Sequence, residues 1–275
     1  MTILVTGATG NVGRRVVDLL LRAGEPVRAL TRDPAAAGLP SAVAVVQGDL
    51  TKPETLTPAV EGVERIYLFP VPDTVSEVVE MARRSGVRRV VVLSSDAVTD
   101  GTDSGLHLRV ERAVEESGLE WTHVRPGEFA LNKVSMWAGS IRSEGVVRMA
   151  YGAVRGVPVH EEDVAAVAVA ALTQHGHAGR AYSVSGPEAL TQRDQVALIS
   201  AAIGRDIRFE EITPQEWRAE LVGRGMPAYA ADYILGFHAR WALRPPVVSE
   251  DVQRVLGRPA RTFARWAAEH APAFR

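Results

Sequence analysis

Apolar residues along the first half of the chain follow two alternating patterns. Short runs of Val, Ile and Leu, such as 3–5 and 88–95, are typical of buried strands, and they alternate with segments of helical periodicity, such as 12–24. Because strands without a polar face belong to parallel sheets covered on both sides, the pattern predicts an α/β, doubly wound parallel (Rossmann) sheet. The other expected strands are 27–32, 43–50, 65–71 and 120–126, and the other expected helices are 53–61, 74–85 and 105–117.

After about Arg125 this alternation ends. A mixed segment at 127–150 precedes an Ala-rich helix at 163–173, which Asp163 is placed to N-cap. The pattern predicts a core of residues 1–135, completed by elements from 155–185, and a smaller, mostly helical C-terminal lobe of residues 136–275. Its expected elements are a strand at 207–212, helices at 191–203 and within 214–241, and two short helices at the C-terminus.

Composition narrows the class of protein. The 275 residues carry a formal net charge of −2 and contain no Cys, which excludes disulfides and thiolate metal sites. No basic excess favours nucleic acid, and no apolar run approaches the roughly 18 residues that span a bilayer. The N-terminus, MTILVTGATG, reads as a strand and a glycine turn instead of an export signal. We expect a cytoplasmic protein without a nucleic-acid or membrane partner; its oligomeric state stays open, with a homodimer as one option.

A glycine-rich turn follows the first predicted strand. Gly7, Gly10 and Gly13 give the spacing Gly-x-x-Gly-x-x-Gly between a strand and a helix. Residues without a Cβ let the backbone approach a pyrophosphate, and the helix N-terminus supplies N–H groups and a positive dipole end. Gly13 also permits close packing of helix on strand. The turn predicts a dinucleotide site.

The second predicted strand ends at Thr31-Arg32-Asp33, about 20 residues past the glycines, where these folds select their cofactor. Arg32 has the planar donor fork that suits a 2′-phosphate, which favours NADP(H). Asp33 keeps NAD(H) as the alternative, because a carboxylate accepts a hydrogen bond from a ribose 2′-hydroxyl. The competing interpretation is a surface ion pair between Arg32 and Asp33.

The motifs TGATGNVG, VRALTRDP, QGDL, VVLSS and SGLEWTHVRPGEF, with YSVSGPEALT further on, resemble the NmrA-like branch of the atypical short-chain dehydrogenases/reductases over nearly the whole chain. The resemblance is strongest to the quinone-reductase-like members. It implies a cofactor site in which the glycine turn holds the pyrophosphate, Arg32 the adenosine end, Asp49 and Leu50 the adenine, and the end of a strand the nicotinamide. The implied residues are Gly7, Thr9, Gly10, Asn11, Val12, Gly13, Arg32, Asp49, Leu50, Phe69, Pro70 and Val71.

Most catalytic members of that superfamily use Tyr-x-x-x-Lys, which this chain lacks. None of its five tyrosines has Lys four residues later, and the only lysines are Lys52 and Lys133. By the resemblance His107 replaces a Lys at the start of a helix, and Glu111 lies on the same helix face, where it can fix the imidazole tautomer. His107 is therefore the candidate proton donor or acceptor, and Ser94 the candidate ligand of a substrate carbonyl. The alternatives are an exposed His beside a surface Glu, and a Ser that caps the next segment.

The C-terminal lobe is the expected substrate-binding region. The resemblance places RPGEF at the substrate cleft, and Tyr233, Phe237 and Trp241 recur on one helix face, where they can cover a flat substrate or serve packing. A metal site at 160–163 is not expected, because neighbouring side chains point in different directions. The candidate substrate-binding residues are Glu128, Phe129, Asn132, Trp137, Tyr233, Phe237 and Trp241.

Two classes of function remain. The first is an NADPH-dependent oxidoreductase acting on a quinone or other aromatic or conjugated carbonyl compound, including tailoring of an aromatic secondary metabolite by reduction or oxygenation. A quinone is electrophilic enough that hydride delivery needs positioning more than a strong acid, which accounts for the missing Tyr and Lys. The second is a non-catalytic NAD(P) sensor of the NmrA type. A nucleotide-sugar epimerase or dehydratase is disfavoured, because those relatives keep the Tyr and Lys.

Overall fold

The structure is a computed structural model and describes residues 2–275. The chain folds as two compact units. Unit 1 contains the chain up to Gly127 together with 161–184 and 250–259, and unit 2 contains 128–160, 185–249 and 260–275.

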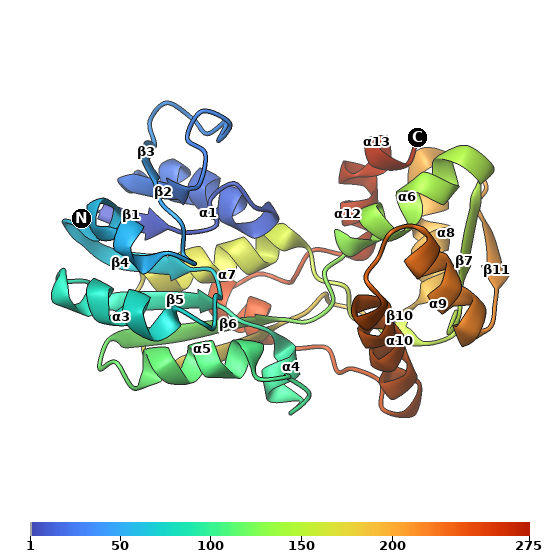
Figure 1. Cartoon of the computed structure of the whole chain (residues 1–275). Coiled ribbons are helices and arrows are strands. Elements are labelled where there is room, and N and C mark those ends of the chain that lie inside the picture. The colour runs from blue at the N-terminus through green and yellow to red at the C-terminus, as the bar shows by residue number, and fades with distance from the viewer. Residues whose placement is uncertain (1) are drawn as a thin grey trace. The chain divides into compact units, whose positions relative to one another are not determined.

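Unit 1 is built on a seven-stranded sheet in which every neighbouring pair is parallel (Figure 1). The strand order is β3-β2-β1-β4-β5-β6-β9, so the order reverses direction beside β1, where open parallel sheets bind their ligands. The predicted α/β Rossmann fold is confirmed. The strands are β1 Thr2–Val5, β2 Val27–Thr31, β3 Ala44–Gln47, β4 Val63–Leu68, β5 Arg89–Leu93, β6 Glu120–Pro126 and β9 Arg180–Val184.

Helices cover both faces of this sheet, because alternate residues of each strand point to opposite sides. Leu4 and Ile66 join a buried cluster with residues of α3 and α5, whereas Ile3 and Tyr67 are buried on the other face, toward α1 and α7 (Figure 1). The helices of unit 1 are α1 Asn11–Arg22, η1 Pro53–Thr55, α2 Thr57–Val60, α3 Val75–Arg84, α4 Asp96–Thr99, α5 Leu106–Glu115, α7 Glu161–Thr173 and α11 Asp251–Leu256.

Unit 2 has its own apolar core, in which Trp137, Trp217, Phe263, Trp266 and Phe274 are buried together. Two small sheets accompany its helices: β7 pairs with β11 in parallel, and β8 pairs with β10 antiparallel. The elements are α6 Asn132–Glu144, β7 Val146–Met149, β8 Arg155–Gly156, β10 Leu190–Thr191, α8 Gln192–Ile203, β11 Arg208–Glu211, α9 Pro214–Gly223, α10 Ala228–Leu243, α12 Phe263–Glu269 and α13 Ala271–Phe274.

The structure differs from the sequence expectations in several places. Residues 155–160, expected to complete the core, belong to unit 2. Unit 2 begins at Glu128 instead of 136, and α11 belongs to unit 1, where it contacts α7 and β9. The mixed segment at 127–150 contains the helix α6 and the strand β7. The helix expected at 53–61 is split into η1 and α2 at Leu56. Asp163 is not an N-cap, because α7 begins at Glu161 and the buried Asp163 carboxylate instead pairs with Arg258 at 2.8 Å.

Among residues 2–275, no helix has the length and apolar character needed to cross a membrane.

Candidate functional site

The glycine turn joins β1 to the N-terminus of α1. Gly7 has a φ of +60°, a conformation that side chains disfavour, and Gly10 precedes the first helical residue without a side-chain cap. A Cβ at Gly13 would overlap the Gly7 carbonyl oxygen. The first N–H groups of a helix have no partner within it, so this turn offers backbone donors and a positive dipole end to an anion.

The end of β4 is tied to this turn through Thr6. The Thr6 hydroxyl donates to the Tyr67 carbonyl at 2.9 Å and accepts from the Phe69 N–H at 2.7 Å. The Phe69 ring packs against Gly7, and 45% of the residue is exposed. Phe69 therefore lies beside the glycine turn, as expected for a residue lining the cofactor, with Pro70 and Val71 following it. Thr6 was not among the candidates, although it directly precedes the first glycine of the motif.

The side chains of Arg32 and Asp33 do not pair with each other in the structure. The Asp33 carboxylate accepts from the backbone N–H groups of Ala35 and Ala36, and this local turn engages one of its oxygens. Within residues 2–275 the exposed Arg32 guanidinium has no hydrogen-bond or ion-pair partner. The surface-pair interpretation thus finds no support, and the guanidinium is available to a ligand.

The two residues that were expected to contact the adenine, Asp49 and Leu50, differ in exposure. Asp49 accepts from the backbone N–H and the hydroxyl of Thr51, and these bonds hold the pKa of its carboxyl below its ordinary value, with a smaller contribution from Arg32. Leu50 is buried in the apolar cluster of unit 1, and its carbonyl accepts from Thr74. Asp49 therefore offers a side chain to a ligand, whereas Leu50 contributes packing.

The candidate Ser94 lies at the carboxyl end of β5 and donates its hydroxyl proton to Glu111 at 2.5 Å. Arg125 binds the same carboxylate with two hydrogen bonds, of 2.9 and 2.6 Å. Burial raises the pKa of the Glu111 carboxyl, but the bonds from Arg125 and Ser94 outweigh burial and leave that pKa lowered. Glu111 is therefore an ionised, fully engaged acceptor. The alternative for Ser94 was a cap, and the neighbouring Ser95 takes that place in α4.

The expected pair of His107 and Glu111 does not form. The His107 Nδ1 lies 3.0 Å from Asp103, whose carboxylate also accepts from backbone N–H groups at the start of α5. Asp103 therefore orients the imidazole, because it precedes the helix and accepts from the N–H groups of its first turn, while Arg125 binds Glu111 from β6. The His107 side chain is about one-quarter exposed, at 26%.

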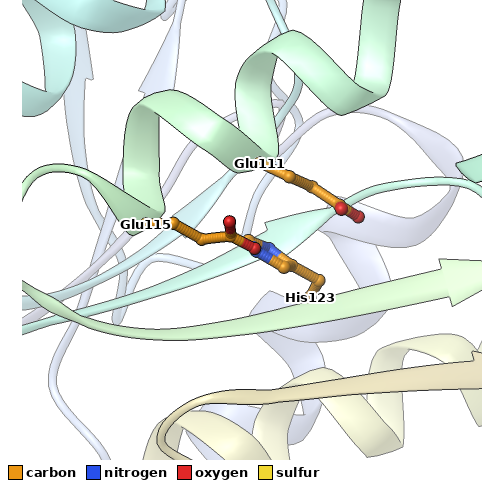
Figure 2. Close-up of side chains that lie close together, drawn as sticks. All are labelled: Glu111, Glu115 and His123. Carbon is orange, nitrogen blue, oxygen red and sulfur yellow. The ribbon is translucent and has the colours of Figure 1, made fainter.

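Figure 2 shows Glu111, Glu115 and His123, whose ligand atoms all lie within 4.8 Å of one another, as in a metal site. Both Glu111 oxygens, however, bind Arg125, and a guanidinium at this distance opposes a cation. The His123 Nε2 bonds to Glu115 at 3.0 Å, and its ring stacks on Trp121. Burial lowers the pKa of His123, so the imidazole is neutral. The arrangement is best explained as a network of ion pairs and hydrogen bonds.

The side chains at 160–163 also have separate partners. His160 bonds to Glu269 within unit 2, whereas Glu161 approaches Arg15 at 3.8 Å within unit 1.

All the candidate substrate-binding residues belong to unit 2. Trp137 is part of its buried core, which favours a packing role. On α10, Tyr233 is exposed, Phe237 is half-buried and Trp241 is buried, and the Phe237 and Trp241 ring centroids are 3.9 Å apart. Glu128 is buried and forms a short ion pair with Lys133. Phe129 and Asn132 lie beside it, at the turn that leads into α6.

Sequence reasoning missed three polar residues around Glu128. Lys133 also donates to Gln192 at 2.9 Å, and His238 lies close enough for the charges of Glu128 and Lys133 to affect its pKa. The signal for Lys133 was present, because it is one of two lysines and follows Glu128 by only five residues. Gln192 and His238 carried no comparable signal, since they come from distant segments.

Comparisons with known proteins agree with this geometry. Residues 7–175 match the model of a family described as NAD(P)H-binding. A (4-alkanoyl-5-oxo-2,5-dihydrofuran-3-yl)methyl phosphate reductase of Streptomyces griseus subsp. griseus is 44% identical over 280 residues, which cover 99% of each chain. An NAD(P)H azoreductase of Xenophilus azovorans is 39% identical over 288 residues, again 99% of each chain.

Solved structures share the fold. The NADPH-dependent quinone oxidoreductase of Escherichia coli, complexed with NADPH, aligns with a TM-score of 0.83 and 25% identity over 97% of this chain and 99% of that chain. The negative transcriptional regulator NmrA, in complex with NADP, aligns with a TM-score of 0.75 and 15% identity over 98% and 95%.

Proposed function

Because the chain belongs to the NAD(P)H-binding family and is an NAD(P)H-dependent oxidoreductase, we propose that it uses NADPH to reduce a quinone or another aromatic or conjugated carbonyl compound. The resemblance to NmrA-like, atypical short-chain dehydrogenases/reductases is confirmed by the family match and the solved relatives.

The observation that carries the proposal is the turn from β1 to α1. Gly7 and Gly10 close a tight turn in which the Gly10 N–H donates to the Gly7 carbonyl, and the buried Gly13 lets α1 pack against that turn. The exposed N-terminus of α1 at Asn11 then offers its free backbone N–H groups, and Phe69 packs against Gly7 from the end of β4. This arrangement fits the pyrophosphate and the adjoining nicotinamide ribose of a dinucleotide. Thr9, Asn11 and Val12 complete the turn on our proposal, and Pro70 and Val71 extend the wall that Phe69 begins.

The preference for NADPH rests on Arg32. Its guanidinium is exposed at the end of β2, while the Asp33 carboxylate is engaged by its own turn. A bidentate Arg suits a 2′-phosphate, whereas one oxygen of the acceptor that would favour NADH is already engaged by backbone N–H groups. The quinone oxidoreductase relative was solved with NADPH, which supports the same choice.

The substrate class rests on the relatives and on unit 2. The named relatives are an azoreductase, a quinone oxidoreductase and a reductase of a furanone phosphate, all of which reduce conjugated small molecules by name. In this chain Tyr233, Phe237 and Trp241 form a continuous aromatic face on α10, suited to a flat apolar ligand. We assign substrate binding to unit 2 on these grounds.

NADPH supplies the hydride when bound. Of the protein groups, His107 is the proposed proton donor, in its imidazolium form: the Asp103 carboxylate only accepts, so Nδ1 keeps its proton, and a second proton on Nε2 is the one given to the product oxygen. The Ser94 proton is donated to Glu111, so in this arrangement Ser94 has no proton for a substrate carbonyl, contrary to the expectation from the sequence, and its oxygen can only accept. Glu111 and Arg125 are positioning residues that fix the Ser94 rotamer.

The test is stopped-flow oxidation of NADPH with a panel of quinones, azo compounds and polycyclic aromatic ketones, beside binding titrations of NADPH and NADH. Arg32→Ala should reduce the preference for NADPH over NADH by about tenfold or more. The matched control is Arg88→Ala, which removes an exposed Arg at the opposite end of the sheet. An unchanged preference in Arg32→Ala would remove Arg32 as the phosphate ligand.

His107→Ala should slow turnover by about 10²-fold without weakening NADPH binding. His175→Ala, at an exposed loop position, is the control. Equal turnover in the parent and His107→Ala would return His107 to a structural role. Tight NADPH binding without oxidation across the whole panel would favour the sensor function instead.

A further inference from the structure

Unit 2 encloses a cluster of polar side chains that the cofactor site does not use. Glu128 follows β6, Lys133 lies in the first turn of α6, Gln192 begins α8 and His238 belongs to α10. Each of the four is more than nine-tenths buried, and Lys133 is only 1% exposed. Lys133 donates to one oxygen of Glu128 and to the Gln192 side-chain oxygen at 2.9 Å, and its ammonium also lies 4.6 Å from the Trp137 ring centroid.

Three atoms of this cluster are buried without a hydrogen-bond partner in residues 2–275: Glu128 Oε2, Gln192 Nε2 and His238 Nε2. The Nδ1 of His238 must donate to the Ile234 carbonyl oxygen, 2.9 Å away, because a carbonyl only accepts. Burial lowers the pKa of His238, so the ring is neutral and its Nε2 carries a bare lone pair. The cluster therefore has two free acceptors and one free donor, and such groups are costly to bury unless something binds them.

The backbone at Gly156 shapes this site. A Cβ on Gly156 would overlap the Oε2 atom of Glu128 and approach the Trp241 ring to 2.9 Å. The carboxylate and the indole thus lie side by side against a residue without a side chain. Pairing of Gly156 with Leu190 holds this strand next to the start of α8, and Thr191 caps that helix through a capping box with Asp194.

Aromatic rings lead from the surface to this point. Tyr233 is 56% exposed, its ring stacks with Phe237 at 6.4 Å, and Phe237 contacts Trp241 at 3.9 Å. Trp241 is buried beside Glu128. The outer part of the region therefore favours an aromatic ligand, and its inner end requires a polar group.

We propose that this cluster binds the hydroxyl group of an aromatic ligand, as found in a phenol or a hydroquinone. A hydroxyl donates one hydrogen bond and accepts others, so it can donate to Glu128 Oε2 or His238 Nε2 while accepting from Gln192 Nε2. A carbonyl or an ether has no proton to donate, and a carboxylate or phosphate would meet the Glu128 carboxylate. This site deepens the proposed function and rests on it for the class of ligand: reduction of a quinone by NADPH and a proton yields a hydroquinone, so the cluster binds a hydroxyl of the reduced product or a hydroxyl substituent of the substrate, and not the quinone carbonyl.

The experiment is calorimetric titration of the full chain with three naphthalenes of similar shape: 2-naphthol, 2-methoxynaphthalene and 2-naphthoate. We expect 2-naphthol to bind at least about tenfold more tightly than the other two, because only the naphthol has a hydroxyl. Similar affinities for 2-naphthol and 2-methoxynaphthalene in the parent would overturn the proposal.

Two variants locate the site. Gly156→Ala displaces the Glu128 carboxylate without changing any charge, and Glu128→Gln replaces an acceptor with a donor at nearly constant size. Each should reduce the preference for naphthol over methoxynaphthalene to about twofold or less, while the Kd for NADPH, which binds in unit 1, stays as in the parent. If both variants keep the parent's preference for naphthol over methoxynaphthalene, the ligand binds elsewhere and the assignment is refuted.

The outcomes separate this inference from the proposed function. Naphthol preference without NADPH oxidation by any quinone would reject the reductase activity and keep the hydroxyl site. Quinone reduction without naphthol preference would keep the reductase activity and reject the site.

Discussion

Each unit contains a cluster of polar side chains around a buried carboxylate, Glu111 in unit 1 and Glu128 in unit 2, and the two clusters differ in completeness. In unit 1 Arg125 binds both oxygens of Glu111, and Ser94 donates a third hydrogen bond. In unit 2 Lys133 binds one oxygen of Glu128 and leaves the other without a partner. An Arg fork can satisfy a whole carboxylate, whereas a Lys ammonium acts as a point charge. The complete cluster is suited to holding a structure in place, and the incomplete one to receiving a ligand.

The largest effect on stability is expected when the cation of the complete cluster is removed. Arg125→Ala leaves the buried Glu111 carboxylate without its cation and should lower the free energy of unfolding by about 4–5 kcal/mol. Urea denaturation measures the change. Arg112→Ala, an exposed position on α5, is the control and should change little. If the double variant Arg125→Met/Glu111→Leu recovers most of the lost stability, the loss came from the unpaired Glu111 charge. If Arg125→Ala loses less than about 1 kcal/mol, that explanation is contradicted.

Lys133→Met should cost less, about 3 kcal/mol, because Lys133 makes a single hydrogen bond to a carboxylate that already has one unpartnered oxygen. The same denaturation experiment applies, with Lys52→Met as the exposed lysine control. Adding Glu128→Gln to Lys133→Met should restore part of the stability, since no unpaired charge remains. A cost equal to that of Arg125→Ala would mean that the two clusters are energetically alike.

Ser94→Ala tests the third bond of the complete cluster. The loss of a hydrogen bond to an ionised carboxylate should cost about 1–2 kcal/mol, because Arg125 still neutralises Glu111. Thermal and urea unfolding measure this cost, and steady-state kinetics run in parallel. A fall in kcat at unchanged stability would assign Ser94 a contact with substrate, whereas a stability loss at unchanged kcat would assign it to the cluster alone.

The smallest effect concerns acid pH. The folded-state pKa of Glu111 is lowered, so its contribution to stability is present above its unfolded pKa near ~4.3 and is lost as pH falls through the lower folded value. Glu111→Gln should therefore flatten the decline of unfolding free energy between about pH 5 and pH 2. Glu77→Gln, an exposed carboxyl, is the control. Parallel acid slopes for Glu111→Gln and the parent would exclude this linkage.

Much of unit 1 follows from local pattern. The Val-rich runs identify the strands, and the strand expected at 120–126 matches β6 residue for residue. Gly7 and Gly13 could be assigned from their spacing because their roles depend on the missing Cβ, which is a property of the residue itself. In unit 2 the helix α6 was missed, since its apolar residues share its buried side with Lys133 and Ser140 and blur the helical period.

The partners of charged side chains were harder to predict. His107 and Glu111 have the right spacing for a pair, as do His107 and Asp103, and sequence alone does not choose between them. The choice depends on Arg125, which reaches Glu111 from the neighbouring β6. The proposed hydroxyl site was still harder to predict, because Glu128, Gln192 and His238 lie more than forty residues apart along the chain.

The sequence by itself determined the Rossmann sheet, the glycine turn and the choice of dinucleotide as ligand, because periodicity and the absence of a Cβ act over a few residues. The tertiary structure alone decided which carboxylate is saturated and which is not, because that depends on distant donors brought together by packing. Glu111 and Glu128 are the same residue type, each near a cation in the sequence. They differ in what the fold places around their second oxygen: in unit 1 a guanidinium binds it, and in unit 2 it is buried against Gly156 without a hydrogen-bond partner in residues 2–275.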